Sequence, residues 1–333
     1  CSSPITTRQR RRRPRQPPST TARPAATWFL LKTHKCASSA VQNIFLRYGH
    51  THNLTFALPY RRQINYFHPL EAFHPAMALP LEAPSSSYNI LCHHTRYSPA
   101  LAAFMPPDTV YITILRKPAA LFESAYSFFN LAKRFGANLT TFLQHPRKYY
   151  TFRTNTIWSR FGRNPAMYDA GLEVRHFDND TAIAAKIREM DERFDLVMLA
   201  EEMEASLVLL RELLCWEWQD VATFRVNARP PAMLTALTET EVEKINEWNH
   251  ADTLLYEHFR RKFQERKVRF GAERLAAEVK ILKSVTDYWR SECRGALVSR
   301  DEKAVTTCLN LQRHEIIYTD LLRARQHPLR HRH

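Results

Sequence analysis

Short apolar runs separated by helical patterns extend along the chain from residue 27. Four of these runs have the length and composition of buried strands: residues 28–31, 88–92, 109–115 and 194–200. The segments between them are long enough to hold crossover helices. Because strands that alternate with helices form a parallel sheet covered on both faces, the pattern predicts an α/β fold.

Apolar positions recur at helical spacing in the segments that follow these strands. The positions after residue 40 mark a first helix, which we expect to end at Gly49. Pro118 suits the first turn of a second helix that runs to about Arg134. A third helix is predicted at residues 204–214, and residues 238–290 are mostly helical. Residues 50–87, rich in Pro, His and Ser, are predicted to be a long irregular insertion.

The N-terminal segment differs in composition from the rest of the chain. Its first 24 residues include seven Arg and five Pro. Such a segment repels itself and has no apolar face to bury, so we expect it to be disordered. The sequence is therefore divided into an Arg/Pro-rich stem (residues 1–26), a single folded domain (residues 27–326) and a short basic tail (residues 327–333).

Composition narrows the classes of function. The chain has 333 residues, of which 44% are hydrophobic and 24% charged, and this excludes wholesale disorder. Its net charge is +15, and the first 70 residues hold ten Arg and two Lys but no acidic residue. Such a basic segment fits a solvated stalk or, alternatively, a patch that binds heparin or nucleic acid.

Sequons and cysteines bear on the compartment. Three Asn-x-Ser/Thr sequons begin at Asn53, Asn138 and Asn179. Together with the leader they favour the secretory pathway and glycosylation at these sites. The six cysteines contain no CxxC pair, which argues against a zinc site. Cys293 and Cys308 frame a short polar segment and are the best candidates for a disulfide, whereas Cys36 and Cys92 fit buried thiols equally well.

Two basic motifs lie where predicted strands end. The first, Lys32-Thr33-His34-Lys35-Cys36-Ala37-Ser38-Ser39, joins the first strand to the first helix. A strand–loop–helix turn directs backbone N–H groups and the positive end of the helix toward an anion. Lysine and serine add charge and hydroxyl donors. Since the glycines of a Walker A loop are absent, the pattern fits either a phosphate site or a basic surface turn.

The second motif is Arg116, at the end of the third predicted strand, with Ser124 eight residues later. Both side chains could reach one phosphate at the edge of the sheet where ligands bind in open α/β folds. The alternative is an arginine that caps a neighbouring helix and an ordinary helical serine.

Together, the two motifs resemble the phosphate-binding motifs of sulfotransferases that use 3′-phosphoadenosine-5′-phosphosulfate (PAPS). Several segments resemble more closely the galactose 3-O-sulfotransferase family: FLLKTHKCASSAVQNIFLRYGH, YNILCHHTR, TVYITILRKPAALFESAYSFF, FDLVMLAEEMEASLVLLRELL and the WNxxDxxLYxHF pattern at residues 248–259. The resemblance covers roughly residues 27–290, returns weakly at residues 308–326, and is nearest to members that act on N-acetyllactosamine-type glycans.

The resemblance implies an enzyme that transfers a sulfuryl group from PAPS to the 3-hydroxyl of a terminal galactose on a glycoprotein or glycolipid, without a metal. The implied fold is a parallel-sheet sulfotransferase core, like that of P-loop kinases, with a helical C-terminal region. It also implies a type II Golgi membrane protein with a lumenal catalytic domain and an N-terminal anchor that precedes this sequence. A homodimer is compatible with it, and a nucleic-acid partner is not expected.

The resemblance also assigns roles to residues. The implied donor site comprises Lys32, Thr33, His34, Lys35, Cys36, Ala37, Ser38, Ser39, Arg116 and Ser124. Lys35 would contact the 5′-phosphosulfate and stabilise the leaving oxygen, while Arg116 and Ser124 would hold the 3′-phosphate. Residues expected to orient the acceptor are Arg96, Asn164, Asp169 and Asn227.

Two histidines are candidates for the base that deprotonates the acceptor. His94 is preferred, because it follows the second strand and emerges at the same edge of the sheet as both motifs. We expect its pKa near the ordinary value of about 6.5, unless bound phosphates raise it. His34, inside the first motif, is the alternative, and either could be a structural histidine. The rival enzyme class, a nucleotide or sugar kinase, needs a Walker-type loop and a carboxylate for Mg²⁺, which are absent near Lys35.

Overall fold

The computed structural model of the chain describes residues 27–68, 70–82, 87–150, 160–224, 236–295 and 301–328. Its sheet has four parallel strands in the order β2-β1-β3-β4. The strands are β1 (Trp28–Leu31), β2 (Ile90–Leu91), β3 (Val110–Leu115) and β4 (Leu196–Leu199). The register aligns Leu31 with Thr113 and Leu115 with Leu199. The α/β prediction is confirmed, and the carboxyl ends of all four strands meet at one edge.

The second strand is shorter than predicted. Only Ile90 and Leu91 pair with β1, because the chain then turns to contact the irregular insertion. Isolated bridges join Tyr66 to His94 and Ala72 to Arg96. Apart from the short helix η1 (Pro75–Met77), the described part of residues 52–87 is irregular, as the sequence predicts.

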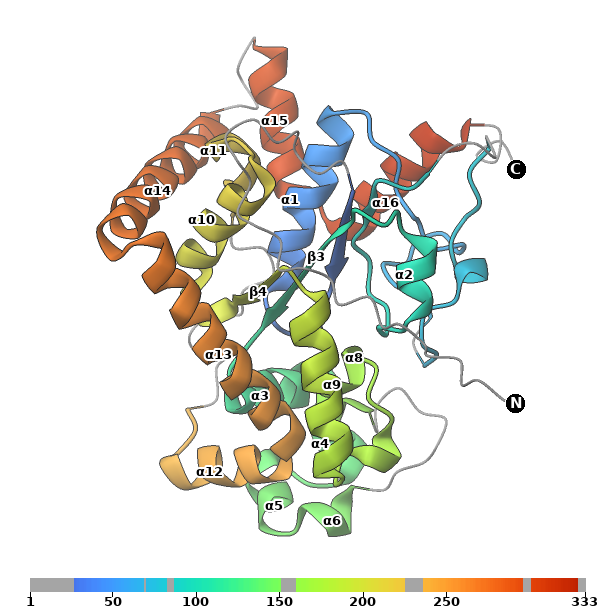
Figure 1. Cartoon of the computed structure of the whole chain (residues 1–333), viewed down its shortest axis with the longest axis vertical. Coiled ribbons are helices and arrows are strands. Elements are labelled where there is room, and N and C mark those ends of the chain that lie inside the picture. Colours follow the sequence, from blue (N-terminus) through green and yellow to red (C-terminus); the bar gives the residue numbers. More distant parts are fainter. Residues whose placement is uncertain are drawn as a thin grey trace, which may run out of the picture.

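Helices lie on both sides of the sheet (Figure 1). In this view α10 (Met203–Leu214), α13 (His250–Phe270) and α14 (Ala272–Gly295) lie to the left of the strands, and α2 (Ala100–Phe104) and α16 (Glu315–Gln326) lie to their right. The shorter helices are α5 (Leu139–Gln144), α6 (Pro146–Tyr149), α8 (Pro165–Asp169), η2 (Val174–His176), η3 (Ala200–Glu202) and α11 (Trp218–Val221). The longer ones are α9 (Asp180–Arg193), α12 (Glu239–Trp248) and α15 (Glu302–Gln312). The predicted helical stretch at residues 238–290 is therefore α12, α13 and most of α14.

The first helix does not end at Gly49. α1 runs from Ser38 to Thr51, and Gly49 lies inside it. A Cβ atom at Gly49 would stand 2.3 Å from the ring of Phe56 and 2.5 Å from Ile90. The glycine is therefore needed for close packing of the helix and not as a stop signal.

The helix that begins at Pro118 is interrupted. α3 (Pro118–Phe128) has proline in its first turn, as predicted, but ends six residues before Arg134. Asn130 then adopts a left-handed conformation with φ +51°, and α4 (Leu131–Phe135) continues in a new direction. Asparagine tolerates this conformation better than most residues. The local conformation of Asn130 therefore ends the helix, and the spacing of apolar residues does not reveal it.

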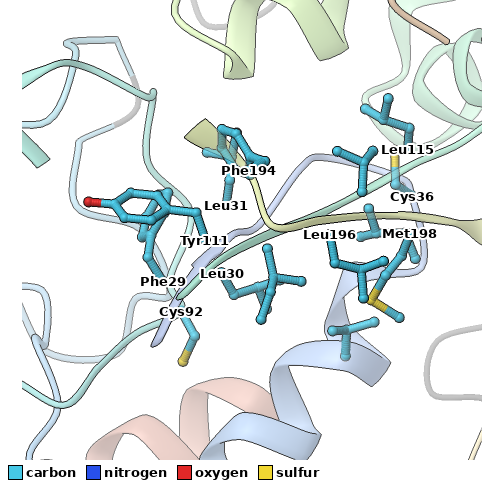
Figure 2. Close-up of a cluster of buried hydrophobic side chains, with 14 of the residues drawn as sticks. Phe29, Leu30, Leu31, Cys36, Cys92, Tyr111, Leu115, Phe194, Leu196 and Met198 are labelled. Atoms are coloured by element: carbon cyan, nitrogen blue, oxygen red, sulfur yellow. The ribbon is translucent and has the colours of Figure 1, made fainter. Parts of the chain in front are cut away.

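The main core lies between the sheet and its helices, and Figure 2 shows part of it. The rings of Phe29, Tyr111 and Phe194 pack together with centroids 5.3–6.3 Å apart, while Leu30 and Cys92 extend to the opposite side. A second cluster of buried residues joins α3, α4, α5 and α12. Cys36 and Cys92 are buried free thiols, which was one of the two readings of their sequence context.

The structure also describes the predicted cysteine pair, the start of the basic tail and the three sequons. The sulfur atoms of Cys293 and Cys308 lie 2.05 Å apart, at the distance of a disulfide. His327, assigned by sequence to the basic tail, is buried beside Gln326. The sequon asparagines are all exposed. Across the part of the chain that the structure describes, no helix has both the length and the apolar character to cross a bilayer.

Candidate active site

The loop between β1 and α1 has the backbone conformation of an anion-binding nest. Lys35 and Ala37 are left-handed, with φ +58° and +59°, and Ala37 is the N-cap of α1. Alternating left- and right-handed residues direct successive backbone N–H groups into one concavity, which the positive end of the helix reinforces. Glycine, on which a Walker A loop relies, is absent. Each left-handed residue without glycine costs about 1–3 kcal/mol, a strain that is typical of functional loops.

Buried side chains hold this loop in shape. The hydroxyl of Thr33 donates to the carbonyl oxygen of Ile114 at 2.5 Å, and that of Ser38 donates to the carbonyl oxygen of Thr33 at 2.5 Å. The thiol of Cys36 contacts the carbonyl oxygen of His34 at 3.3 Å, and burial raises its pKa to about 12. In this structure these three side chains therefore fix the backbone of the loop.

Lys32 is buried and has three close polar partners. Its side chain is 1% exposed, and its Nζ atom lies 3.0 Å from Oε2 of Glu315, 2.9 Å from Nε2 of His94 and 3.2 Å from Oγ of Ser39. Burial lowers the pKa of Lys32, and the carboxylate of Glu315 opposes that shift. The ammonium thus forms hydrogen bonds with His94 and Ser39 and an ion pair with Glu315. Glu315 is a site residue that the sequence analysis missed, because it lies on α16, far along the chain.

His94 is held at both ring nitrogens. Because an ammonium can only donate, Nε2 of His94 accepts from Lys32, and Nδ1–H donates to the carbonyl oxygen of Lys32 at 2.7 Å. Burial, followed by the charges of His34 and Lys32, lowers the pKa of His94 well below its usual value. The expectation of a pKa near 6.5 was therefore wrong, because the sequence does not reveal that Lys32 is buried against this ring.

His34 is held differently. Nδ1 of His34 lies 2.9 Å from Oδ1 of Asp169, and the backbone N–H of His34 donates to Oδ2 of Asp169 at 2.7 Å. The His34 ring stacks on the His94 ring, with centroids 4.0 Å apart, and is 26% exposed. Within the described part of the chain its Nε2 atom makes no hydrogen bond. Such a carboxylate–imidazole pair fixes the tautomer and leaves Nε2 to exchange a proton with a ligand.

Asp169 owes its position to a residue far along the sequence. It ends α8, whose first backbone amides donate to the buried carboxylate of Asp252, at 3.0 Å from Ala166 and 2.8 Å from Met167. Burial raises the pKa of Asp252 to about 7, and these two amides oppose that shift. Asp252 belongs to the WNxxDxxLYxHF pattern, so one function of that pattern is to anchor the helix that carries Asp169.

Two of the predicted acceptor-binding residues help to hold α8 in place in this structure. Asn164 is buried, its backbone N–H donates to Oδ1 of Asn249 at 2.8 Å, and its Oδ1 accepts from the backbone of Asp252 at 3.1 Å. The buried guanidinium of Arg96 donates to the carbonyl oxygen of Tyr168 at 3.2 Å and pairs with Glu173 at 3.0 Å. A third predicted residue, Asn227, lies outside the described residues.

The second motif meets the first at the sheet edge. Arg116 follows β3, and its guanidinium donates to the carbonyl oxygen of Lys35 at 3.1 Å. Ser124 lies two turns into α3 and is buried. The ammonium of Lys35 lies 3.6 Å from the ring centroid of Phe128. Strand ends thus gather the loop, Arg116 and His94 at one edge. Among the described residues, no group of three His, Cys, Asp or Glu side chains is arranged to hold a metal ion.

These features define a class of protein: a parallel α/β protein whose sheet edge presents a cationic nest for an anionic ligand beside a carboxylate–histidine pair. A profile of the family described as galactose-3-O-sulfotransferase matches residues 6–326. The chain belongs to this family.

Individual relatives agree with that assignment. The chain is 35% identical to human galactosylceramide sulfotransferase over 81% of this chain and 64% of the relative. It is 37% identical to mouse galactose-3-O-sulfotransferase 3, over 80% and 62% of the two chains, and 35% identical to pig galactose-3-O-sulfotransferase 2, over 77% and 66%. The chain thus spans a little under two thirds of the length of these relatives.

Proposed function

We propose that this chain transfers a sulfuryl group from PAPS to the 3-hydroxyl of a terminal galactose. The observation that carries the proposal is the His34–Asp169 pair, in which a base candidate stands one residue from Lys35 in the anion-binding loop. Membership of the family supports the reaction class. It does not favour the two rival readings, a kinase and a heparin- or nucleic-acid-binding protein.

The reaction joins the galactose O3 atom to sulfur and breaks the bond between sulfur and the phosphate oxygen of the donor. The proton of the hydroxyl passes to the protein, and adenosine 3′,5′-bisphosphate leaves. Negative charge grows on the departing oxygen, so a fixed cation near it lowers the barrier. We assign that role to Lys35, assisted by the loop amides that the left-handed residues direct into the nest. PAPS supplies the activated sulfuryl group, and the protein supplies position and charge.

Arg116 and Ser124 are proposed to bind the 3′-phosphate. One guanidinium nitrogen of Arg116 already donates to the backbone of the loop. Its remaining donors can form a fork to a phosphate, a geometry that lysine cannot supply. Arg116 thus contacts the loop proposed for the 5′-phosphosulfate and can also bind the 3′-phosphate.

We propose His34 as the base, in place of the His94 that the strand pattern favours. Both nitrogens of His94 are engaged by Lys32, whereas His34 keeps Nε2 available and has its Nδ1–H directed at Asp169. An imidazole held this way can accept the hydroxyl proton at Nε2 while Asp169 stabilises the imidazolium that forms. His94 is then assigned to support the ring of His34 by stacking and to orient Lys32.

The finer assignments of compartment follow from the proposed activity. We propose a Golgi lumenal enzyme held by an N-terminal membrane anchor, glycosylated at Asn53, Asn138 and Asn179, with the Cys293–Cys308 pair oxidised. The three asparagines are exposed and so accessible to glycosylation, and the two sulfur atoms lie at the distance of a disulfide. The acceptor is proposed to be an N-acetyllactosamine-type glycan, as the sequence resemblance implies. The similar identities to relatives named for galactosylceramide and for galactose favour neither acceptor.

The test is transfer of labelled sulfate from PAPS to a panel of β-galactosides and galactosylceramide, followed by linkage analysis of the product. We expect sulfate at the galactose 3-position, with and without added metal, and activity that survives deletion of residues 1–24. Adenosine 3′,5′-bisphosphate should raise the melting temperature. No transfer to any galactoside, together with no thermal shift, would reject the proposal.

The base assignment is tested by matched substitutions. His34→Asn should lower kcat by about 10² to 10⁴, while binding of adenosine 3′,5′-bisphosphate measured by calorimetry stays close to wild type. His94→Asn should affect nucleotide binding and stability as well, because it removes an acceptor from Lys32. The base would be His94 if His94→Asn lowered kcat with intact nucleotide affinity and His34→Asn stayed active.

A further inference from the structure

An exposed phenylalanine stands beside the proposed reaction centre. Phe128 is 65% exposed, although most large apolar side chains of this domain are buried. It is the last residue of α3 and lies four residues after Ser124, so both side chains lie on one face of the helix. Such an exposed aromatic ring next to a binding site is available to a ligand.

A row of rings links Phe128 to His34. The Phe128 and Phe129 centroids lie 5.1 Å apart, and Phe129 stacks on Phe161 at 4.1 Å with nearly parallel planes. Phe161 in turn lies 4.6 Å from the His34 ring. The row is anchored at its buried end by Phe161 and by the stacked histidines, so that its exposed end has a defined position relative to the base.

We propose that Phe128 is the stacking platform for the terminal galactose of the acceptor, and that Lys35 covers it until the donor binds. The inference rests on the proposed function. The axial 4-hydroxyl of galactose leaves the opposite face of the sugar ring with C–H groups, which pack on the electron-rich face of an aromatic ring. The equatorial 3-hydroxyl then lies at the edge of the stacked sugar, free to approach a base.

The cover is the Lys35 ammonium, 3.6 Å from the centroid of Phe128. A cation over the ring occupies the face that the sugar needs. The 5′-phosphate of the donor offers Lys35 a stronger partner, and moving the ammonium to that phosphate uncovers the ring. Donor binding should therefore strengthen acceptor binding by the free energy of the lost cation–π contact, about two- to fivefold, and by reciprocity the acceptor strengthens donor binding equally.

The first test measures kinetics. Phe128→Ala should raise the KM for an N-acetyllactosamine acceptor by about tenfold without raising the KM for PAPS, and Phe128→Tyr should restore the acceptor KM. Tyr288→Ala, which removes an exposed aromatic ring from α14, is the matched control and should change neither constant. If Phe128→Ala instead weakens PAPS with the acceptor KM unchanged, the ring stacks on adenine and the inference is wrong.

The second test measures the cover directly. Acceptor binding to the full chain is titrated calorimetrically with and without adenosine 3′,5′-bisphosphate. We expect tighter binding with the nucleotide in wild type, and in Lys35→Ala an acceptor affinity that is already high and does not respond to it. Equal affinities in wild type would overturn the proposed cover. Failure of the chain to bind the nucleotide at all would instead reject the proposed function, so the two failures are distinguishable.

Discussion

The Nδ1 atom of His34 lies 2.9 Å from a carboxylate oxygen of Asp169, across 135 positions of sequence. The same carboxylate also accepts the backbone N–H of His34. One buried acid thus sets both the tautomer of the ring and the path of the loop that bears it. A substitution of Asp169 that keeps one of these two contacts can therefore separate the geometry of the loop from the proposed proton transfer.

The first prediction concerns that separation. Asp169→Asn keeps an oxygen for the backbone N–H of His34 but can turn its amide N–H₂ toward Nδ1, which favours the wrong tautomer. We expect kcat to fall by about 10² to 10⁴, with the affinity for adenosine 3′,5′-bisphosphate within about twofold of wild type. Asp178→Asn, at an exposed partner of Arg163, is the control. An equal loss of nucleotide affinity would mean that Asp169 only shapes the loop.

The second prediction concerns Arg116, whose guanidinium donates to the carbonyl oxygen of Lys35. Arg116→Lys keeps the charge but loses the fork, so affinity for adenosine 3′,5′-bisphosphate should fall by about tenfold or more. Affinity for adenosine 5′-phosphate, which lacks the 3′-phosphate, should barely change. Calorimetry with both nucleotides measures this. Lys117→Ala, at the exposed neighbour, should match wild type, and equal losses for the two nucleotides would count against the 3′-phosphate assignment.

The third prediction concerns the buried pair of Lys32 and Glu315. Glu315→Gln leaves a buried ammonium without its carboxylate, and breaking such a pair costs about 3–5 kcal/mol of the free energy of unfolding. In a Lys32→Met background the same change should cost much less, because no charge remains to be compensated. Urea unfolding of the four proteins closes the cycle. A Glu315→Gln cost that is the same in both backgrounds would show that the pair does not couple.

The fourth prediction concerns acid stability. Burial lowers the pKa of His93 to about 3, and its Nε2 lies 2.9 Å from the hydroxyl of Thr319. Between pH 6.5 and pH 3 the unfolded chain binds a proton at this residue and the folded chain does not, so stability falls as pH falls. At pH 5 the loss from His93 should be about 2 kcal/mol relative to neutral pH.

His93→Gln should flatten that dependence, since glutamine does not titrate in this range. The measurement is the free energy of unfolding in urea at pH 5.0 and pH 7.0. His52→Gln, which removes an exposed histidine of the same domain, is the control for the substitution itself. A His93→Gln slope equal to that of wild type would contradict the prediction.

The apolar pattern predicts the architecture because it records burial directly. All four strands and the long C-terminal helices were found near their expected positions, and the strand ends placed Arg116 and the first loop at one edge. The breaks were harder to predict. Gly49 resembles a helix stop yet serves close packing, and Asn130 ends α3 through a local conformation that apolar spacing does not encode.

The sequence predicts which residues form the candidate site but not the hydrogen bonds and ion pairs between them. The motifs identify His34, His94 and Asp169, but which histidine keeps an available nitrogen depends on Lys32 being buried, and that depends on Glu315. Hydrogen bonds between residues so distant in sequence leave no periodic trace. Left-handed backbone at Lys35 and Ala37 likewise has no glycine to signal it.

The contact between Lys32 and Glu315 also sets an order of events during synthesis. The loop after β1 leaves the ribosome long before α16 does, and domains consolidate only when their interacting parts have emerged. Until α16 arrives, the Lys32 ammonium has no carboxylate and resists burial. A nascent chain interrupted before α16 would thus carry both basic motifs without a settled loop between β1 and α1. Competence for the proposed donor binding is in this way coupled to synthesis of the helix that delivers Glu315.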